Sequence, residues 1–260
     1  MKFKLLPVDW REDAPLAAPS EHSLLKADTS LTGFIAGPSP TGCYALTVNP
    51  LASGAPAQMQ DFIRYESAHG RQVSVHSPGF DVMPLLTTPT ARVNDPVYLI
   101  HSTTLPNYAL IRADGWVKST ARLRRDGLHR EAIGFAPLGE PLDYLDYVMF
   151  APLDGGCGAE MVVNSHLRGE VCYDPDAEYE PQARMYFDAK RIIADGLAVR
   201  DGVHTIKVHD ALELSKYLLQ TVFGADLPLS DGKTKWTPAT FTKAADAHFL
   251  APVIAACSEK

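Results

Sequence analysis

Residues 96–117, PVYLIHSTTLPNYALIRADGWV, place a histidine and three hydroxyl residues directly after a short apolar run. His101 offers an imidazole, and Ser102 and Thr103 follow it with hydroxyl groups and main-chain amides. Such a set can hydrogen-bond an amide or a ribose, because these ligands present both donors and acceptors. A histidine that satisfies a turn, next to a threonine that caps a helix, is the alternative interpretation of the same residues.

The neighbouring residues predict that His101 lies where a strand ends and a helix begins. The β-branched and aromatic residues of VYLIHS favour a strand. In LPNYALIRADG the apolar residues recur at helical spacing, and Thr103 or Thr104 can cap the first turn. Gly115 stands where a left-handed C-cap belongs, so we expect a short helix directly after the histidine.

Short segments at irregular spacing predict an α+β fold rather than a doubly wound sheet. The same patterns predict strands over residues 142–152, 159–166, 182–193 and 201–208, and helices over residues 211–223 and 237–256. The last helix would have Thr237 as its cap and Pro238 at its first position. Residues 1–92 are rich in Pro, Ser, Ala and Thr; they predict short strands, turns and one helix that ends at Gly70.

Composition restricts the function classes. A hydrophobic share of 46% and a charged share of 21% are ordinary for a packed globular protein. No apolar run approaches the ~20 residues of a membrane span, and no secretory leader is evident, so we expect a cytoplasmic protein without a membrane partner. The net charge of −7 argues against broad attraction to nucleic acid. The four cysteines lack metal-ligand spacing, so no metal site is predicted.

The run HSTTLPNYALIRADG resembles the opening motif of the ADP-ribosyltransferase superfamily. It is most similar to the branch that contains the DarT-type DNA ADP-ribosyltransferases and the tRNA 2′-phosphotransferases, and His101, Thr103, Asn107, Ile111 and Gly115 follow the DarT-type order. The resemblance covers about residues 97–219 and is most specific in its first third. It implies a split, mainly antiparallel sheet with few helices and a cleft for NAD, which is consumed as a substrate.

This resemblance implies two regions and a first set of site residues. Residues 1–92 would form an N-terminal extension or accessory subdomain, and residues 93–260 an ADP-ribosyltransferase-like domain with a C-terminal helix. His101 and Ser102 would bind NAD, with Thr103 and Asn107 beside them.

The basic and aromatic stretches that follow support the same expectation. By resemblance, Arg125 of the run ARLRR, with Arg124 next to it, would contact the NAD diphosphate and assist catalysis. A guanidinium suits this role because it stays charged and binds phosphate oxygens in pairs. LDYLDYVMFAP is similar to the DYVPFYFxP segment of DarT-type enzymes, so Tyr147 would stack on the cationic nicotinamide ring. A solvated basic surface and a core tyrosine are the alternatives.

The sequence departs from the resemblance at the catalytic carboxylate. The chemistry requires one because positive charge grows at the anomeric carbon as nicotinamide leaves. The family position falls on Arg184, whereas Glu180 lies four residues earlier in an acidic run. A shifted strand could bring Glu180 to the site; Arg184 and His204 could instead hold a phosphate; or catalysis could be lost. Glu180 is our catalytic candidate.

Together these features predict an NAD-dependent ADP-ribosyltransferase of toxin or effector type that modifies a macromolecular acceptor. The basic stretch 118–130 favours a nucleic acid, and the overall acidity favours a protein. PLDGGCGAEM replaces the RSPML that follows the aromatic strand in DarT-type proteins, so their target choice does not carry over. An NAD-dependent RNA 2′-phosphotransferase and an inactive binding protein are the alternatives. An antitoxin or immunity protein could be a partner.

Overall fold

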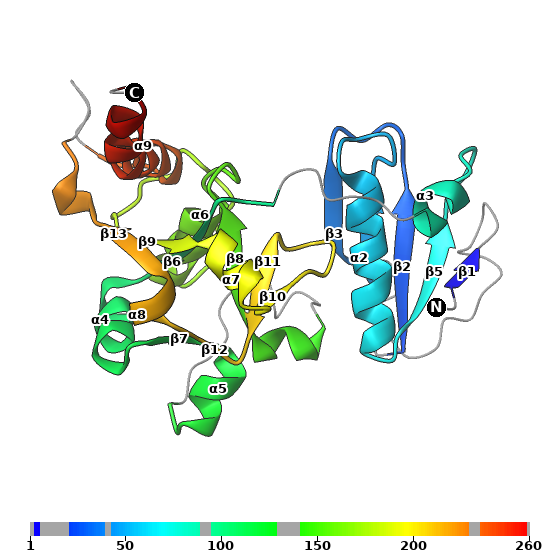
Figure 1. The fold of residues 1–260 in the computed structure, drawn as a ribbon, viewed down its shortest axis with the longest axis horizontal. Helices are drawn as coiled ribbons and strands as arrows, with labels where there is room; N and C mark the ends of the chain where they lie inside the picture. The colour runs from blue at the N-terminus through cyan, green and yellow to red at the C-terminus, as the bar shows by residue number, and fades with distance from the viewer. Residues whose placement is uncertain are drawn as a thin grey trace. The chain divides into compact units, whose positions relative to one another are not determined.

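The computed structural model describes residues 3–5, 21–39, 43–88, 95–128, 141–228 and 235–258, with only the backbone for 3–5 and 253–258. The chain has an α+β fold, which confirms the predicted class (Figure 1). It divides into two compact units. The N-terminal unit comprises Met1–Asp95, Phe135–Tyr144 and Val199–Thr205, and the second unit Pro96–Gly134, Leu145–Ala198 and Ile206–Lys260.

The N-terminal unit contains a mixed sheet in the order β1-β5-β2-β4-β3. Its strands are β1 (Phe3–Leu5), β2 (His22–Ala27), β3 (Phe34–Pro38), β4 (Tyr44–Val48) and β5 (Gln72–His76). All neighbours are parallel except β3, which runs antiparallel to β4. The helix α2 (Ala55–Ala68) joins β4 to β5 along one face of the sheet, as a parallel crossover requires (Figure 1). The short helix α3 (Met83–Thr87) follows β5.

The second unit contains a six-stranded antiparallel sheet in the order β10-β11-β8-β6-β9-β13. These strands are β6 (Tyr98–Thr103), β8 (Tyr147–Pro152), β9 (Ala183–Asp188), β10 (Ala198–Val199), β11 (Ile206–His209) and β13 (Leu218–Val222). A separate pair joins β7 (Trp116–Lys118) to β12 (Ala211–Glu213). Asp210, with a φ of 66°, turns the chain out of β11 and into β12.

Helices cover both faces of this sheet. They are α4 (Leu105–Asp114), α5 (Thr120–Arg125), α6 (Gly158–Arg168), α7 (Ala189–Ala194), α8 (Leu214–Tyr217) and α9 (Pro238–Ser258), with 3-10 turns η2 (Leu142–Asp146) and η3 (Gly224–Asp226). The helices α6 and α9 bury Ile100 and Tyr186 on one face. Leu99, Phe150 and Met185 belong to the core of the opposite face. None of the helices in the described part of the chain has the length and apolar character that a bilayer crossing requires.

Local capping predictions are confirmed. Thr104 is the N-cap of α4 and its hydroxyl accepts from the amide of Asn107, while Gly115 ends the helix with a φ of 80°. The hydroxyl of Thr237 accepts from the amide of Thr240 at the start of α9. These motifs lie within a few residues of one another, so local chemistry alone selects them.

Two element predictions are wrong, and two predicted strands are wrong in part, because residues 142–146 form η2 and residues 189–193 lie in α7. Residues 159–166 were expected as a strand and lie in the helix α6, which packs on β6 and α9. Residues 211–223 were expected as one helix and instead form β12, the single turn α8 and β13. In the second case two neighbouring strands, β7 and β9, provide backbone partners that override the helical pattern of the sequence.

Candidate functional site

His101 lies near the carboxyl end of the central strand β6 and is half-buried. Its Nδ1 is 3.2 Å from the main-chain oxygen of Met149 on β8. A carbonyl oxygen only accepts, so Nδ1 carries the proton in the neutral ring and Nε2 presents a lone pair. Burial lowers the pKa of His101, against the effect of the hydrogen bond to Met149. The ring is therefore a neutral hydrogen-bond acceptor at Nε2 near pH ~7.

Further candidate residues gather at the same end of β6. Thr103 follows on the same face as His101, because alternate residues of a strand share a face. Thr104 caps α4, whose first turn includes Asn107, and the amide of Leu105 donates to the side-chain oxygen of Gln182 at 2.8 Å. This arrangement places hydroxyl groups and a helix N-terminus directly after the imidazole.

The exposed Glu180 lies just before β9, whose first residue pairs with the last residue of β6, Thr103 with Ala183. Gln182, two residues after Glu180, contacts the first residue of α4. The segment that carries Glu180 therefore enters the fold at the His101 end of β6.

Ser102 and Arg184 are paired in register but project to the opposite face, towards α6 and α9. The hydroxyl of Ser102 donates to Glu160 at 2.6 Å. Arg184 donates through Nη1 to both Glu160 oxygens, at 2.7 and 2.8 Å, and through Nε to Asp246 at 2.9 Å. Thr242 adds a hydrogen bond to Glu160 at 2.8 Å. The Arg184 guanidinium, considered above as a possible phosphate ligand, is thus already paired with two carboxylates.

The electrostatics of this network follow from its burial. The Arg184 side chain is 1% exposed and Glu160 is fully buried. Burial alone would lower the pKa of Arg184, but Glu160 and Asp246 outweigh it and raise the pKa. Burial raises the pKa of Asp246, and the nearby Arg184 offsets this only in part. The sequence analysis assigned no role to Glu160 or Asp246.

Tyr147 begins β8 on the face opposite to Val148 and Phe150, which belong to the core on the His101 side. The Nζ of the fully buried Lys207 lies 4.6 Å from the centre of the Tyr147 ring. The ring therefore already contacts a cation within the fold.

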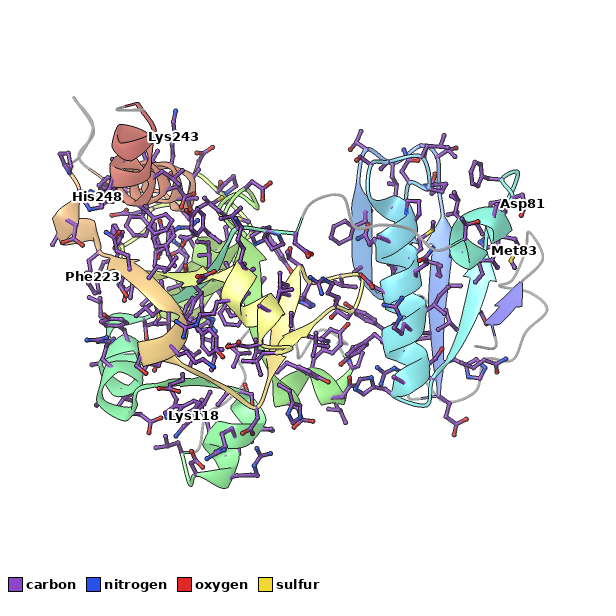
Figure 2. All side chains as sticks on the ribbon, viewed as in Figure 1. Asp81, Met83, Lys118, Phe223, Lys243 and His248 are labelled. Atoms are coloured by element: carbon purple, nitrogen blue, oxygen red, sulfur yellow. The ribbon has the colours of Figure 1, made fainter. Side chains whose placement is uncertain are left out.

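The predicted phosphate-binding arginines lie on the short helix α5. Arg124 is exposed, and Arg125 is ion-paired with Asp210. Arg122 bridges Asp126 and Asp210 at 2.9 and 2.8 Å, and Lys118, labelled in Figure 2, pairs with Asp126 at 2.7 Å. Carboxylates thus offset much of the positive charge in the described part of the basic stretch.

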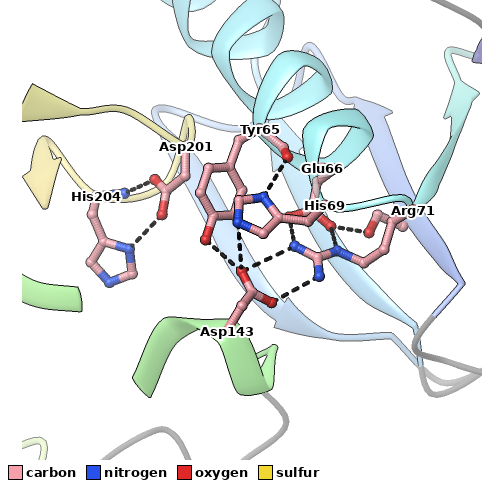
Figure 3. Close-up of polar contacts among 8 residues, drawn as sticks. Tyr65, Glu66, His69, Arg71, Asp143, Asp201 and His204 are labelled. Atoms are coloured by element: carbon pink, nitrogen blue, oxygen red, sulfur yellow. Dashed lines mark hydrogen bonds and ion pairs between the residues drawn. The ribbon is translucent and has the colours of Figure 1, made fainter. Parts of the chain in front are cut away.

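His204 belongs to the N-terminal unit. Its Nδ1 lies 3.0 Å from the carboxylate of Asp201, which is fully buried and also accepts from the amide of His204 (Figure 3). The amide of Val203 donates to the same carboxylate. Its ring meets the ring of Tyr144 edge to face, with 5.4 Å between centroids.

The N-terminal unit contains a polar cluster that the sequence analysis did not anticipate (Figure 3). Arg71 forks onto the fully buried Glu66 through Nε and Nη2, at 2.6 and 2.9 Å, and reaches Asp143 through Nη1 at 2.8 Å. The hydroxyl of Tyr65 donates to Asp143 at 2.5 Å, and Nε2 of His69 lies 3.6 Å from the same carboxylate.

The Glu66–Arg71 spacing around a helix end was the one local indication of this cluster. Asp143 is 72 residues from Arg71, so no sequence pattern joins them. Burial alone would raise the pKa of Asp143, but hydrogen bonds from Arg71 and Tyr65 outweigh it and lower the pKa.

Within the described residues, no group of three or more His, Cys, Asp or Glu side chains could hold a metal ion. Comparisons with protein-family models, with curated proteins and with solved structures found no match to the chain.

Proposed function

We propose that the second unit is an NAD-dependent ADP-ribosyltransferase of toxin or effector type, with the split antiparallel sheet of that superfamily. The observation that carries the proposal is the 3.2 Å separation between Nδ1 of His101 and the main-chain oxygen of Met149, from which we infer the tautomer of His101. Its Nδ1 proton is directed to Met149, which leaves Nε2 as an acceptor at the end of the central strand. A ribose hydroxyl is the donor that this nitrogen suits.

The residues after His101 would complete the NAD site. The Thr103 hydroxyl can both donate to and accept from the nicotinamide amide or the ribose. The dipole of α4 also favours a negative diphosphate near its first turn, although the amides of Leu105 and Asn107 already donate within the protein. Asn107 lies within that turn.

Glu180 would supply the carboxylate. The bond between the nicotinamide nitrogen and the ribose C1′ breaks, and its electron pair neutralises the pyridinium. An oxocarbenium-like C1′ remains, which a nearby carboxylate stabilises. The acceptor nucleophile then bonds to C1′ and loses its proton to Glu180. Exposure of Glu180 is compatible with access of a large acceptor.

The charge pairing favours this reaction over RNA 2′-phosphate transfer, since Arg184 is already matched by Glu160 and Asp246. The same reasoning applies to the acceptor. Pairing of Lys118, Arg122 and Arg125 with aspartates weakens the basic face, so a protein acceptor is better supported than a nucleic acid.

The test is release of nicotinamide from NAD by the purified full chain, with water as the default acceptor. We expect His101→Ala to lower the rate at least about 100-fold, and Glu180→Gln by a similar factor. Matched controls are His166→Ala, an exposed histidine of α6, and Glu178→Gln, an exposed glutamate two residues from Glu180. An inactive wild type that also fails to bind NAD would refute the proposal, as would equal loss in each variant and its control.

A further inference from the structure

Glu180 is exposed, yet the residues on each side of it are held by contacts within the second unit. Tyr179 is buried, and its amide donates to the main-chain oxygen of Trp236 at 2.9 Å. Pro181 packs closely on Gly224, because a Cβ on that glycine would lie 2.5 Å from the Pro181 Cβ. An acidic surface loop is ordinarily solvated and mobile, whereas this segment presents its carboxylate from a backbone fixed on both sides.

Gln182 adds a contact that joins this segment to α4. The residue is 3% exposed. Its side-chain oxygen accepts from the Leu105 amide at 2.8 Å, and its Nε2 donates to the main-chain oxygen of Glu180 at 3.2 Å. A main-chain amide only donates and a carbonyl oxygen only accepts, so these two partners fix the orientation of the Gln182 amide. One buried side chain thus hydrogen-bonds the main chain of both segments.

The two segments carry different parts of the candidate site. Glu180 is the proposed carboxylate, and Leu105 is the first residue of α4, whose first turn includes Asn107. The strand β9 starts directly after Gln182, and its first residue pairs with Thr103 at the end of β6. The Gln182 amide therefore links the chain before β9 to the helix after β6.

We propose that Gln182 is a positioning residue: by bonding the main chain at Glu180 and at the start of α4, it holds the carboxylate in place relative to the residues that would bind NAD. It acts through the two main-chain groups that it joins. A displacement of ~1 Å at a catalytic group can lower a rate about 100-fold. The effect on catalysis rests on the proposed function, whereas the link between the two segments does not.

The primary test substitutes Gln182→Met in the full chain, with Gln220→Met as the matched control. Methionine is similar in length to glutamine but lacks the amide that makes both bonds. Gln220 is half-buried on β13 and takes no part in this link.

Two structural readouts follow the link itself. We expect Gln182→Met to raise amide exchange at Leu105 at least about tenfold, because that amide loses its acceptor. The main-chain order parameter of Glu180 should fall from about 0.85 to below about 0.6, because its carbonyl loses its donor. Gln220→Met should change neither quantity.

Nicotinamide release from NAD measures the consequence for catalysis. Because Gln182→Met frees both segments, we expect it to lower kcat at least about tenfold and also to raise the KM for NAD. Gln220→Met should leave kcat and KM within about twofold of the wild type.

A second pair of variants moves the carboxylate without releasing α4. Gly224→Ala places a Cβ against Pro181, whereas Gly158→Ala adds one where no atom lies within 4 Å. Neither glycine has a positive φ, so both substitutions avoid backbone strain. We expect Gly224→Ala to lower kcat at least about tenfold while the KM for NAD and the exchange rate of Leu105 stay unchanged. Gly158→Ala should leave all three unchanged.

An unchanged Leu105 exchange rate and an unchanged Glu180 order parameter in Gln182→Met would overturn the inference, as would equal changes in Gln220→Met. A Gln182→Met variant that loses the link but keeps the kcat and KM of the wild type would overturn the positioning role. If the wild type releases no nicotinamide, the proposed function fails, yet the exchange rate and the order parameter still decide whether Gln182 joins the two segments.

Discussion

Each unit buries one arginine between two carboxylates, and the two networks differ in how they are assembled. Arg71 and Glu66 are five residues apart, around the turn that follows α2. Arg184 finds Glu160 and Asp246 at separations of 24 and 62 residues, on two helices that meet only in the finished fold. In the first network the Arg71–Glu66 contact is local, whereas the second network forms only when β9, α6 and α9 are packed together.

In each network one carboxylate is partly exposed, Asp143 in the first and Asp246 in the second, and we call these the outer carboxylates. Their pKa values are shifted in opposite directions. The pKa of Asp143 is lowered, because hydrogen bonds from Arg71 and Tyr65 outweigh its burial. The pKa of Asp246 is raised, because burial dominates, and Glu160 adds a repulsive negative charge. Both arginines also bind a fully buried glutamate, so the two outer carboxylates differ in the balance between their own burial and their hydrogen bonds.

Arg184→Met is the most severe test of this difference. It removes the cation from two carboxylates, one of them fully buried, and we expect a loss of about 3–5 kcal/mol in the free energy of unfolding. Urea denaturation measures it, and Arg191→Met, at an exposed position on α7, is the control with a loss below about 1 kcal/mol. A loss below about 1 kcal/mol for Arg184→Met would show that the network does not stabilise the fold.

Arg71→Met should have a smaller effect, about 2–3 kcal/mol, because the Arg71 side chain is 8% exposed against 1% for Arg184, so water can replace more of the lost contact. The loss should be confined to the N-terminal unit. Native-state amide exchange can resolve this. We expect faster exchange in α2 and β5 and an unchanged exchange rate in β9 and α9. An equal increase in both units would mean that the two networks are not independent.

The same contrast explains how much of the structure the sequence could predict. The capping residues Thr104 and Gly115, and the helix end at Gly70, depend on neighbours within a few residues and were predicted correctly. The strand and helix assignments of α6 and of residues 211–223 depended on distant packing partners, and they were wrong. Local propensity is a weak guide where tertiary pairing decides.

The candidate site follows the same rule. His101, Thr103 and Asn107 were predicted together, and the structure places them at one end of β6 because all three lie within one strand and one helical turn. Arg184 was assigned by its position along a strand, but the alternation of faces and two carboxylates far along the chain decide where its charge is used. Asp143 could not be recognised at all, because its partner Arg71 is 72 residues away.

The pH dependence of stability should separate the two outer carboxylates, with effects smaller than those of the arginine variants. The usual pKa is 3.8, and Asp143 lies below it in the folded state. Between the folded-state pKa and 3.8 the unfolded state binds more protons than the folded state, so stability is lost as the pH falls through this range. Asp143→Asn should remove this loss.

Asp246 has the opposite sign, because its folded-state pKa lies above 3.8. The folded state binds more protons between the two values, so stability falls as the pH rises through that window. Asp246→Asn should remove this fall. Urea midpoints measured from about pH 2.5 to about pH 7 provide the slopes. If both variants change the slope of stability against pH in the same direction, the two outer carboxylates do not differ in the way described.

The smallest effect is expected for an ion pair that has the same geometry without burial. Glu178 and Lys235 are 2.7 Å apart, the same separation as Arg184 and Glu160, but both side chains are 63% exposed. A double-mutant cycle with Glu178→Gln and Lys235→Met should give a coupling of at most about 0.5 kcal/mol, and high salt should abolish it. A coupling above about 1 kcal/mol would mean that distance rather than burial governs these pairs. In that case the large effect expected at Arg184 could not be attributed to its enclosure beneath α6 and α9.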